Sequence, residues 1–174
     1  MSLMNWNVLV GDEAGFMYLL GSETTFLFTA KTWSMDIIPK VLSDLETAGV
    51  PLSYTKGVHS IKFTRIPAGR LGTYALGKIH VSVFANCEIP LAKLIVHELA
   101  HHLDDMEDVV SDPKLMHEKK KKAKYLDPYA RKNVDEYFAV GVEEYYFGDR
   151  KKLSKNCPVL HKKISQLHHK YRSL

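Results

Sequence analysis

The spacing of apolar residues divides the chain into two parts. Between residues 58 and 84 apolar side chains recur at every second position, which is typical of half-buried strands. This pattern predicts three short strands over residues 61–66, 74–76 and 79–83, the last two joined as a hairpin at Gly77-Lys78. Nearer the N-terminus, short apolar runs predict two more strands, at Asn7–Val10 and Phe26–Thr29. Apolar residues at helical spacing predict a helix over Met35–Ala48.

After Pro90 the spacing of apolar residues is helical to the end of the chain. We predict helices over Pro90–Asp105, from Pro113 with Ser111 or Asp112 as cap, from Asp127 or Asn133 to Phe147, and from Pro158 to about Tyr171. Strands followed by helices predict an α+β fold, with a small N-terminal sheet packed on a mostly helical C-terminal half. We expect a single domain over residues 1–174, with its sheet-bearing part at about 1–89 and its helical part at about 90–174.

Composition narrows the class of protein. Hydrophobic residues make up 45% of the 174 residues, yet no apolar run approaches the roughly 18 residues of a membrane helix, so we expect no membrane span. The net charge is +4, and the lysine run Lys119–Lys124 is typical of a solvated helix face, so we expect no nucleic-acid partner.

Cys87 and Cys157 are too few for a disulfide framework, and whether they are free or form one bridge stays open. We expect a monomer.

The predicted helix at 90–105 carries histidines and acids on an apolar background, and such groups need partners when they are buried. His97 and His101 are four residues apart, so their side chains lie one turn above the other on the same face. Two imidazoles placed in this way can bind one metal ion, with Glu98 beside the ion but not bound to it. The pattern His-Glu-x-x-His is the signature of zinc metalloproteases.

Asp104 lies three residues after His101 and shares its face, so we expect its carboxylate to accept the second imidazole N–H, a solvated carboxylate being the alternative. Catalytic zinc usually has three protein ligands, so one more must follow later in the chain. Glu136 is the best candidate because it lies among apolar residues, although it also fits a capping box with Asn133. The rival ligands are Asp135, Glu143 and Glu144.

Tyr129 lies seven residues before Glu136, which opens the sequence Glu-Tyr-Phe-Ala. Together with His97-Glu98-Leu99-Ala100-His101 and Asp104, this spacing resembles the catalytic domain of anthrax lethal factor-like metallopeptidases, a family that includes small secreted Pro-Pro endopeptidases. Lys152–Pro158 is similar to a Lys-Leu-x-x-x-Cys-Pro sequence near the end of these small relatives, and Leu71–Phe84 is similar to the hairpin that lines the substrate. The likeness covers roughly residues 58–170.

The resemblance implies a gluzincin-like zinc endopeptidase with one Zn²⁺ ion. It implies that Glu136 is the third ligand beside His97 and His101, that Glu98 carries the proton of the attacking water, and that Tyr129 donates a hydrogen bond to the oxyanion. Val140 stands where the relatives carry a second acid, so we expect Glu143 or Glu144 to take over its role.

The expected substrate is an extended protein or peptide that pairs with an exposed edge strand. The candidate strand is Lys78–Phe84, whose substrate-binding residues would be Ile79, His80, Val81 and Ser82; the alternative is that its apolar side chains only face the core. The resemblance leaves two specificities open, cleavage between prolines as in the small relatives or at other bonds as in lethal factor. It implies secretion, although Met1–Gly15 shows no signal peptide and a cytoplasmic location is the alternative.

The alternative function is a catalytically silent zinc-binding interaction module of a toxin or surface protein. Glu98 and Tyr129 argue against it, because a structural zinc site needs neither a base nor an open coordination position.

Overall fold

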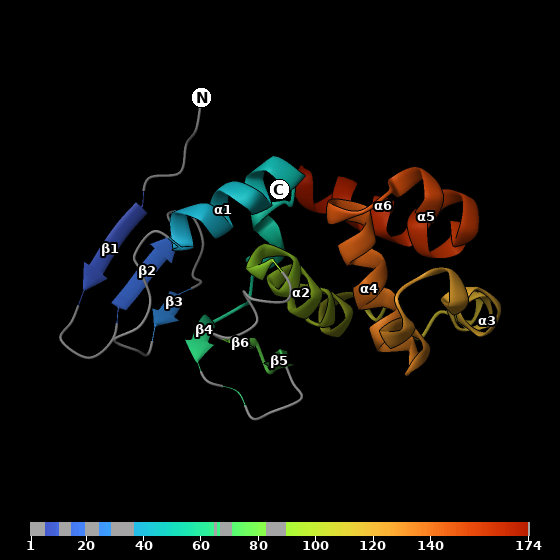
Figure 1. The fold of residues 1–174 in the computed structure, drawn as a ribbon, viewed down its shortest axis with the longest axis horizontal. Coiled ribbons are helices and arrows are strands. Elements are labelled where there is room, and N and C mark those ends of the chain that lie inside the picture. The colour runs from blue at the N-terminus through green and yellow to red at the C-terminus, as the bar shows by residue number, and fades with distance from the viewer. Residues whose placement is uncertain are drawn as a thin grey trace.

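The computed structural model describes residues 6–10, 15–19, 25–28, 37–64, 66, 71–82 and 90–173. Within these residues, six strands form one sheet on one side of the molecule, and most of the helices extend away from it on the other (Figure 1). The strands lie in the first half of the chain and the longest helices follow in the second half. The predicted α+β class is therefore confirmed.

The described strands form a mixed sheet in the order β1-β2-β3-β4-β6-β5. Their bounds are Trp6–Val10 for β1, Gly15–Leu19 for β2, Thr25–Phe28 for β3, Ser60–Thr64 for β4, Gly72–Ala75 for β5 and Lys78–Ser82 for β6. The three central strands β3, β4 and β6 run parallel, whereas β1, β2 and β5 pair antiparallel with their neighbours. The predicted strands and the hairpin are present, but β2 was not predicted, and residues 83–84 of the predicted hairpin lie outside the described residues.

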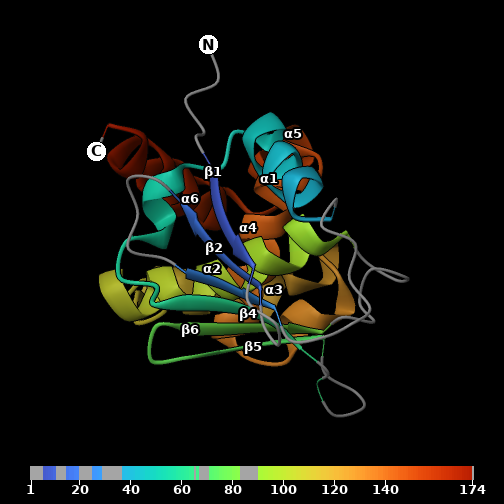
Figure 2. The same cartoon turned by 90° about the vertical axis from the view of Figure 1, so that its left-hand side faces the viewer.

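Strand β5 forms the edge of the sheet, and β6 lies inside it. Figure 2 shows β4, β6 and β5 side by side, with β5 at the end. The two-residue turn between β5 and β6 has positive φ at both positions, 48° at Leu76 and 73° at Gly77. This is the backbone of a type I′ hairpin turn, whose twist matches the twist of the strands. The free edge at this end of the described sheet therefore belongs to β5, the first strand of the hairpin.

Six α-helices are described. They are α1 (Ile37–Ala48), α2 (Leu91–Glu107), α3 (Pro113–Lys122), α4 (Val134–Phe147), α5 (Arg150–Asn156) and α6 (Pro158–Arg172), with short 3₁₀ helices η1 (Leu52–Thr55), η3 (Ala123–Tyr125) and η4 (Pro128–Arg131). Asp112 and Asn133 cap α3 and α4, which decides between the starts that the sequence left open. Helix α5 was not predicted. None of the helices in the described part of the chain has the length and apolar character needed to cross a membrane.

Helix α2 is the centre of the fold. Its predicted apolar stripe is buried, and it packs on the sheet and on α4. The buried residues of this stripe are Leu91, Leu94, Ile95, Leu99 and Leu103. Because α2 packs on both the sheet and α4, its polar side chains lie between β5 and α4.

Cys157 is buried and carries no disulfide bond, its Sγ lying 3.9 Å from the carbonyl oxygen of Lys122. Burial raises the pKa of this thiol. The predicted alternative of a bridge to Cys87 concerns a residue outside the described ranges.

Candidate metal centre

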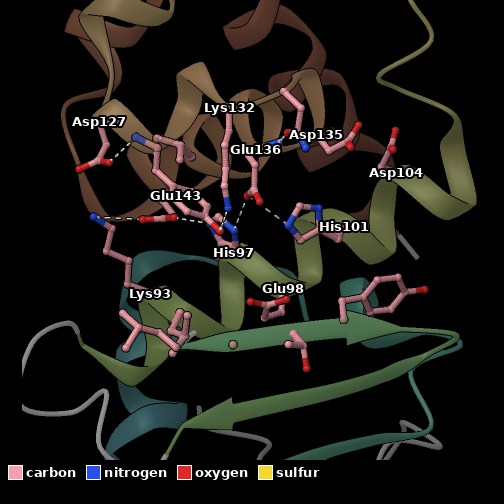
Figure 3. Close-up of a pocket in the computed structure, with 18 of the residues that line it drawn as sticks. Lys93, His97, Glu98, His101, Asp104, Asp127, Lys132, Asp135, Glu136 and Glu143 are labelled. Atoms are coloured by element: carbon pink, nitrogen blue, oxygen red, sulfur yellow. Dashed lines mark hydrogen bonds and ion pairs between the residues drawn. The ribbon is translucent and has the colours of Figure 1, made fainter. Parts of the chain in front are cut away.

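Helix α2 presents His97 and His101 on one face, and α4 brings Glu136 opposite them (Figure 3). The Glu136 Oε2 atom lies 3.1 Å from His97 Nε2 and 3.5 Å from His101 Nε2. The ligand atoms of the three residues all lie within 4.8 Å of one another. These residues could therefore hold one metal ion, and two imidazole nitrogens with one carboxylate oxygen are a donor set that suits zinc.

The start of α4 places Glu136 at this point. The side-chain Oδ1 of Asn133 accepts the Glu136 backbone N–H at 2.7 Å and so caps the helix. Only the backbone N–H of Glu136 takes part in this cap, and its carboxylate points toward the two histidines. Burial raises the pKa of Glu136, but the hydrogen bond with His97 and the charges of both histidines outweigh burial, so the pKa lies below its usual value.

Glu143 contacts the Nδ1 side of His97, and Glu136 contacts the Nε2 side. Its Oε1 lies 2.5 Å from His97 Nδ1, and its Oε2 lies 3.1 Å from the ammonium of Lys93. Burial lowers the pKa of His97, but hydrogen bonds with Glu136 and Glu143 outweigh burial and raise the pKa to about 9. Glu143 thus holds the Nδ1 side of the candidate ligand His97 and does not belong to the three residues whose ligand atoms converge.

The two histidines differ in their electrostatic surroundings. Burial lowers the pKa of His101, and the nearby positive charge of His97 lowers it further. A neutral imidazole is the form that binds a metal ion, so the state of His101 suits ligation.

Glu98 lies on the side of α2 that faces the sheet (Figure 3). Its side chain is only 4% exposed, and it packs directly on Gly72 of β5. A Cβ atom added to Gly72 would lie 2.2 Å from Glu98 Oε1, so only glycine leaves room for the carboxylate here. Burial raises the pKa of Glu98 to about 7, opposed by the charge of His97 and reinforced by the charges of Glu136 and Glu143.

Tyr129 lines the cleft beside His97 and is exposed to solvent. It lies in η4, where Asp127 accepts its backbone N–H at 2.9 Å, and its ring centroid is 5.8 Å from that of His97. The side chain is 45% exposed, and the Lys132 ammonium donates to its hydroxyl at 3.1 Å. A phenol in this place can reach a molecule that enters the site.

These side chains line a cleft of about 830 Å³ between β5, α2, η4 and α4. Its wall on the sheet side is formed by residues 71–74, and its floor by the polar face of α2. Most of the charged groups in the cleft are carboxylates, with Lys93 and Lys132 as the basic side chains among the residues that the structure describes. Such a negative cleft attracts a cation.

The carboxylate of Asp104 was predicted to accept a hydrogen bond from His101, but in the structure it has a different partner. Asp104 Oδ1 accepts the backbone N–H of Val110 at 2.8 Å, just beyond the left-handed residue Asp108 that ends α2. The carboxylate thus satisfies a backbone donor of the turn after the helix. It lines the cleft, but its hydrogen bond stabilises the helix end.

The predicted edge strand was also wrong. Strand β6 has a paired strand on each side, because β5 returns antiparallel along it and closes its free side. Three of its four proposed substrate-binding residues are buried, and in the described part of the chain the strand residues that line the cleft belong to β5. The residues concerned are Ile79, Val81 and Ser82, which are buried, and His80, which is partly exposed.

The remaining acids of α4 lie apart from the cluster. Asp135 lines the cleft without joining the three convergent ligand atoms. Glu144 Oε2 lies 3.4 Å from the backbone nitrogen of Asp149, at the other end of the helix. Lys93 and Lys132 also line the cleft and were not predicted, because neither residue belongs to a motif that would have identified it.

The structure is thus an α+β domain in which two histidines of one helix and a carboxylate of a later helix come together in a cleft beside a sheet edge, where they could hold a metal ion. The family model for anthrax toxin lethal factor, N- and C-terminal domain, matches residues 50–167. The chain therefore belongs to this family, and the matched range contains the whole cluster. No curated protein sequence matches the chain.

Proposed function

We propose that the protein is a zinc-dependent endopeptidase that hydrolyses peptide bonds in extended protein substrates. The observation that carries this proposal is the convergence of His97, His101 and Glu136 in a cleft that Glu98 and Tyr129 also line. Catalytic zinc sites typically use three such ligands and leave one position open. A ligand set of two histidines and a later glutamate is also what a gluzincin-like fold would require.

Each residue has a separate role in this proposal. Zinc, when bound, would supply a Lewis acid that polarises the scissile carbonyl and activates a water molecule. Glu98 would accept the proton of that water and pass it to the leaving amine. Tyr129 would donate a hydrogen bond from its phenol to the carbonyl oxygen as negative charge develops there.

The substrate would bind along β5. The Ser82 N–H donates to the Leu71 carbonyl at 2.7 Å, so this pair is hydrogen-bonded across the hairpin. In an antiparallel ladder such pairs alternate with pairs that are not hydrogen-bonded, so the N–H and C=O groups of Gly72 and Tyr74 point to the free edge. An extended peptide would pair with these groups as an added strand.

We further propose that residues 1–174 act as a single metallopeptidase domain, with the sheet-bearing part at about 1–89 and the zinc site in the part at about 90–174. Membership of a toxin-related family supports secretion of the protein. We propose that the enzyme acts as a monomer, because every residue assigned a role comes from one chain.

The test is to measure zinc in the purified protein and cleavage of a peptide library that includes Pro-Pro sequences. We expect one zinc ion per chain, and cleavage that a chelator removes and added zinc restores. The cleaved sequences would decide between Pro-Pro bonds and other bonds. Absence of bound zinc would contradict the whole scheme, and zinc without cleavage would favour the silent interaction module.

Glu143→Gln is expected to weaken zinc binding by about 10- to 100-fold, because the amide cannot hold His97 as a carboxylate does. The measurement is the zinc dissociation constant from competition with a chelating dye. Glu144→Gln is the matched control, since Glu144 is the next residue but bonds at the other end of α4. Equal affinities of the two variants would contradict the role of Glu143.

A further inference from the structure

His102 follows the candidate ligand His101 but points to the other side of α2. It is 3% exposed, and both ring nitrogens have partners. Nε2 lies 2.8 Å from the carbonyl oxygen of Lys56, and Nδ1 lies 3.1 Å from the hydroxyl of Tyr74. A carbonyl can only accept, so Nε2 carries the hydrogen, and in the neutral ring Nδ1 accepts the Tyr74 O–H. His102 thus connects α2 to the loop before β4 and to β5.

Tyr74 is held at its hydroxyl from a second direction. Besides its bond with His102, the hydroxyl lies 3.3 Å from the backbone nitrogen of Gly77, in the turn that joins β5 to β6. Burial raises the pKa of Tyr74 to about 12, and the nearby carboxylate of Asp105 contributes to the rise. The phenol therefore keeps its proton and remains available as a donor over the neutral pH range.

The contacts between α2 and β5 repeat in register. Glu98 and His102 are four residues apart on the helix, a rise of about 6 Å, and Gly72 and Tyr74 are two apart on the strand, about 6.8 Å. Glu98 packs on Gly72, and His102 bonds to Tyr74. Gly72 and Tyr74 are also the two strand residues whose backbone groups point to the free edge.

We propose that His102 and Tyr74 are positioning residues for the substrate, an inference that rests on the proposed endopeptidase function. Their bond holds the free edge of β5 at a set distance from Glu98 and from the cluster of His97, His101 and Glu136. A strand with only one partner strand opens easily, and a peptide that pairs with it must then also order it. With the bond in place, the edge is already ordered when the peptide arrives.

The test uses Tyr74→Phe, which removes only the hydroxyl. For a peptide long enough to pair with all of β5, we expect KM to rise by about 3- to 10-fold and kcat to stay within about twofold. A short peptide that spans little more than the cleaved bond should show no change in KM. His102→Gln should behave like Tyr74→Phe, because a glutamine amide can still donate to Lys56 but lacks the acceptor at the Nδ1 position.

His102→Asn is the conservative variant, since its amide oxygen can take the place of Nδ1 and accept the Tyr74 hydroxyl. It should keep KM within about twofold of the unchanged protein. Tyr146→Phe is the matched control, because Tyr146 is also a buried tyrosine whose hydroxyl bonds to a histidine, His168, and to Tyr54, away from the cleft. It should lower the melting temperature without changing KM.

Hydrogen exchange gives a readout that does not need activity. The amides of Thr73 and Ala75 pair with β6, and in Tyr74→Phe they should exchange about 3- to 10-fold faster in the zinc-loaded protein without substrate. Unchanged exchange, an unchanged KM, or a loss confined to kcat would each overturn the proposal. If the unchanged protein cleaves no peptide, the proposed function fails, and exchange at β5 still decides whether the Tyr74–His102 bond orders the edge.

Discussion

Glu98→Gln is expected to lower kcat by about 10²- to 10⁴-fold while zinc remains bound. Glutamine has nearly the same shape as glutamate, so it should occupy the same space against Gly72. It cannot accept a proton, and it is not one of the three convergent ligands, so only the proton transfer is removed. The measurement is kcat on a peptide selected from the library, together with zinc per chain.

The control for this variant is Glu118→Gln. Glu118 is also a buried carboxylate, but it accepts hydrogen bonds from Tyr137 and from the backbone of Val159 and Leu160, and it does not line the cleft. Its replacement should lower the stability of the α3–α6 contact and leave kcat nearly unchanged. Full activity of Glu98→Gln with zinc bound would rule out the proposed chemistry.

Glu136→Ala is expected to weaken zinc binding by more than about 100-fold and to abolish cleavage at low zinc. Loss of a residue that only supports a ligand typically weakens binding by about 10- to 100-fold, and loss of the ligand itself removes a direct bond to the ion. The start of α4 should survive, because the cap uses the backbone N–H of residue 136 and the side chain of Asn133. The measurements are zinc affinity and the circular dichroism of the zinc-free protein.

Asp135→Ala is the matched control, since it removes a neighbouring acid that lines the cleft but does not join the cluster. It should keep zinc affinity within about threefold, the effect of one partly screened charge. If Asp135→Ala lost zinc and Glu136→Ala kept it, the assignment of the third ligand would be wrong.

Much of the helical half could be predicted from the sequence. The stripe from Leu91 to Leu103 and the caps at Asp112 and Asn133 are local signals, because helix formation depends on neighbours three or four residues away. Helix α5 was missed because its seven residues are mostly basic and polar and carry little apolar periodicity. Strand β2 was missed because Gly15–Leu19 does not alternate between polar and apolar residues.

The candidate site was predicted in part. His97, His101 and Glu98 follow from spacing on a single helix, and the structure brings Glu136 to the same point. The support of His97 by Glu143 joins residues 46 positions apart, so nothing local could distinguish it from a rival ligand. Asp104 was given the wrong partner because a backbone donor in the following turn competed for the same carboxylate.

The identity of the edge strand shows where local information ends. Alternation of side chains indicates that residues 72–82 form a hairpin, but it does not say which of the two strands pairs with the rest of the sheet. That choice depends on β4, which pairs parallel with β6 although β5 lies between the two strands in the sequence. Spacing along the chain is thus sufficient to identify the candidate ligands on α2. Which strand forms the edge and which carboxylate contacts His97 depend on how distant elements pack, because those contacts are made across the fold.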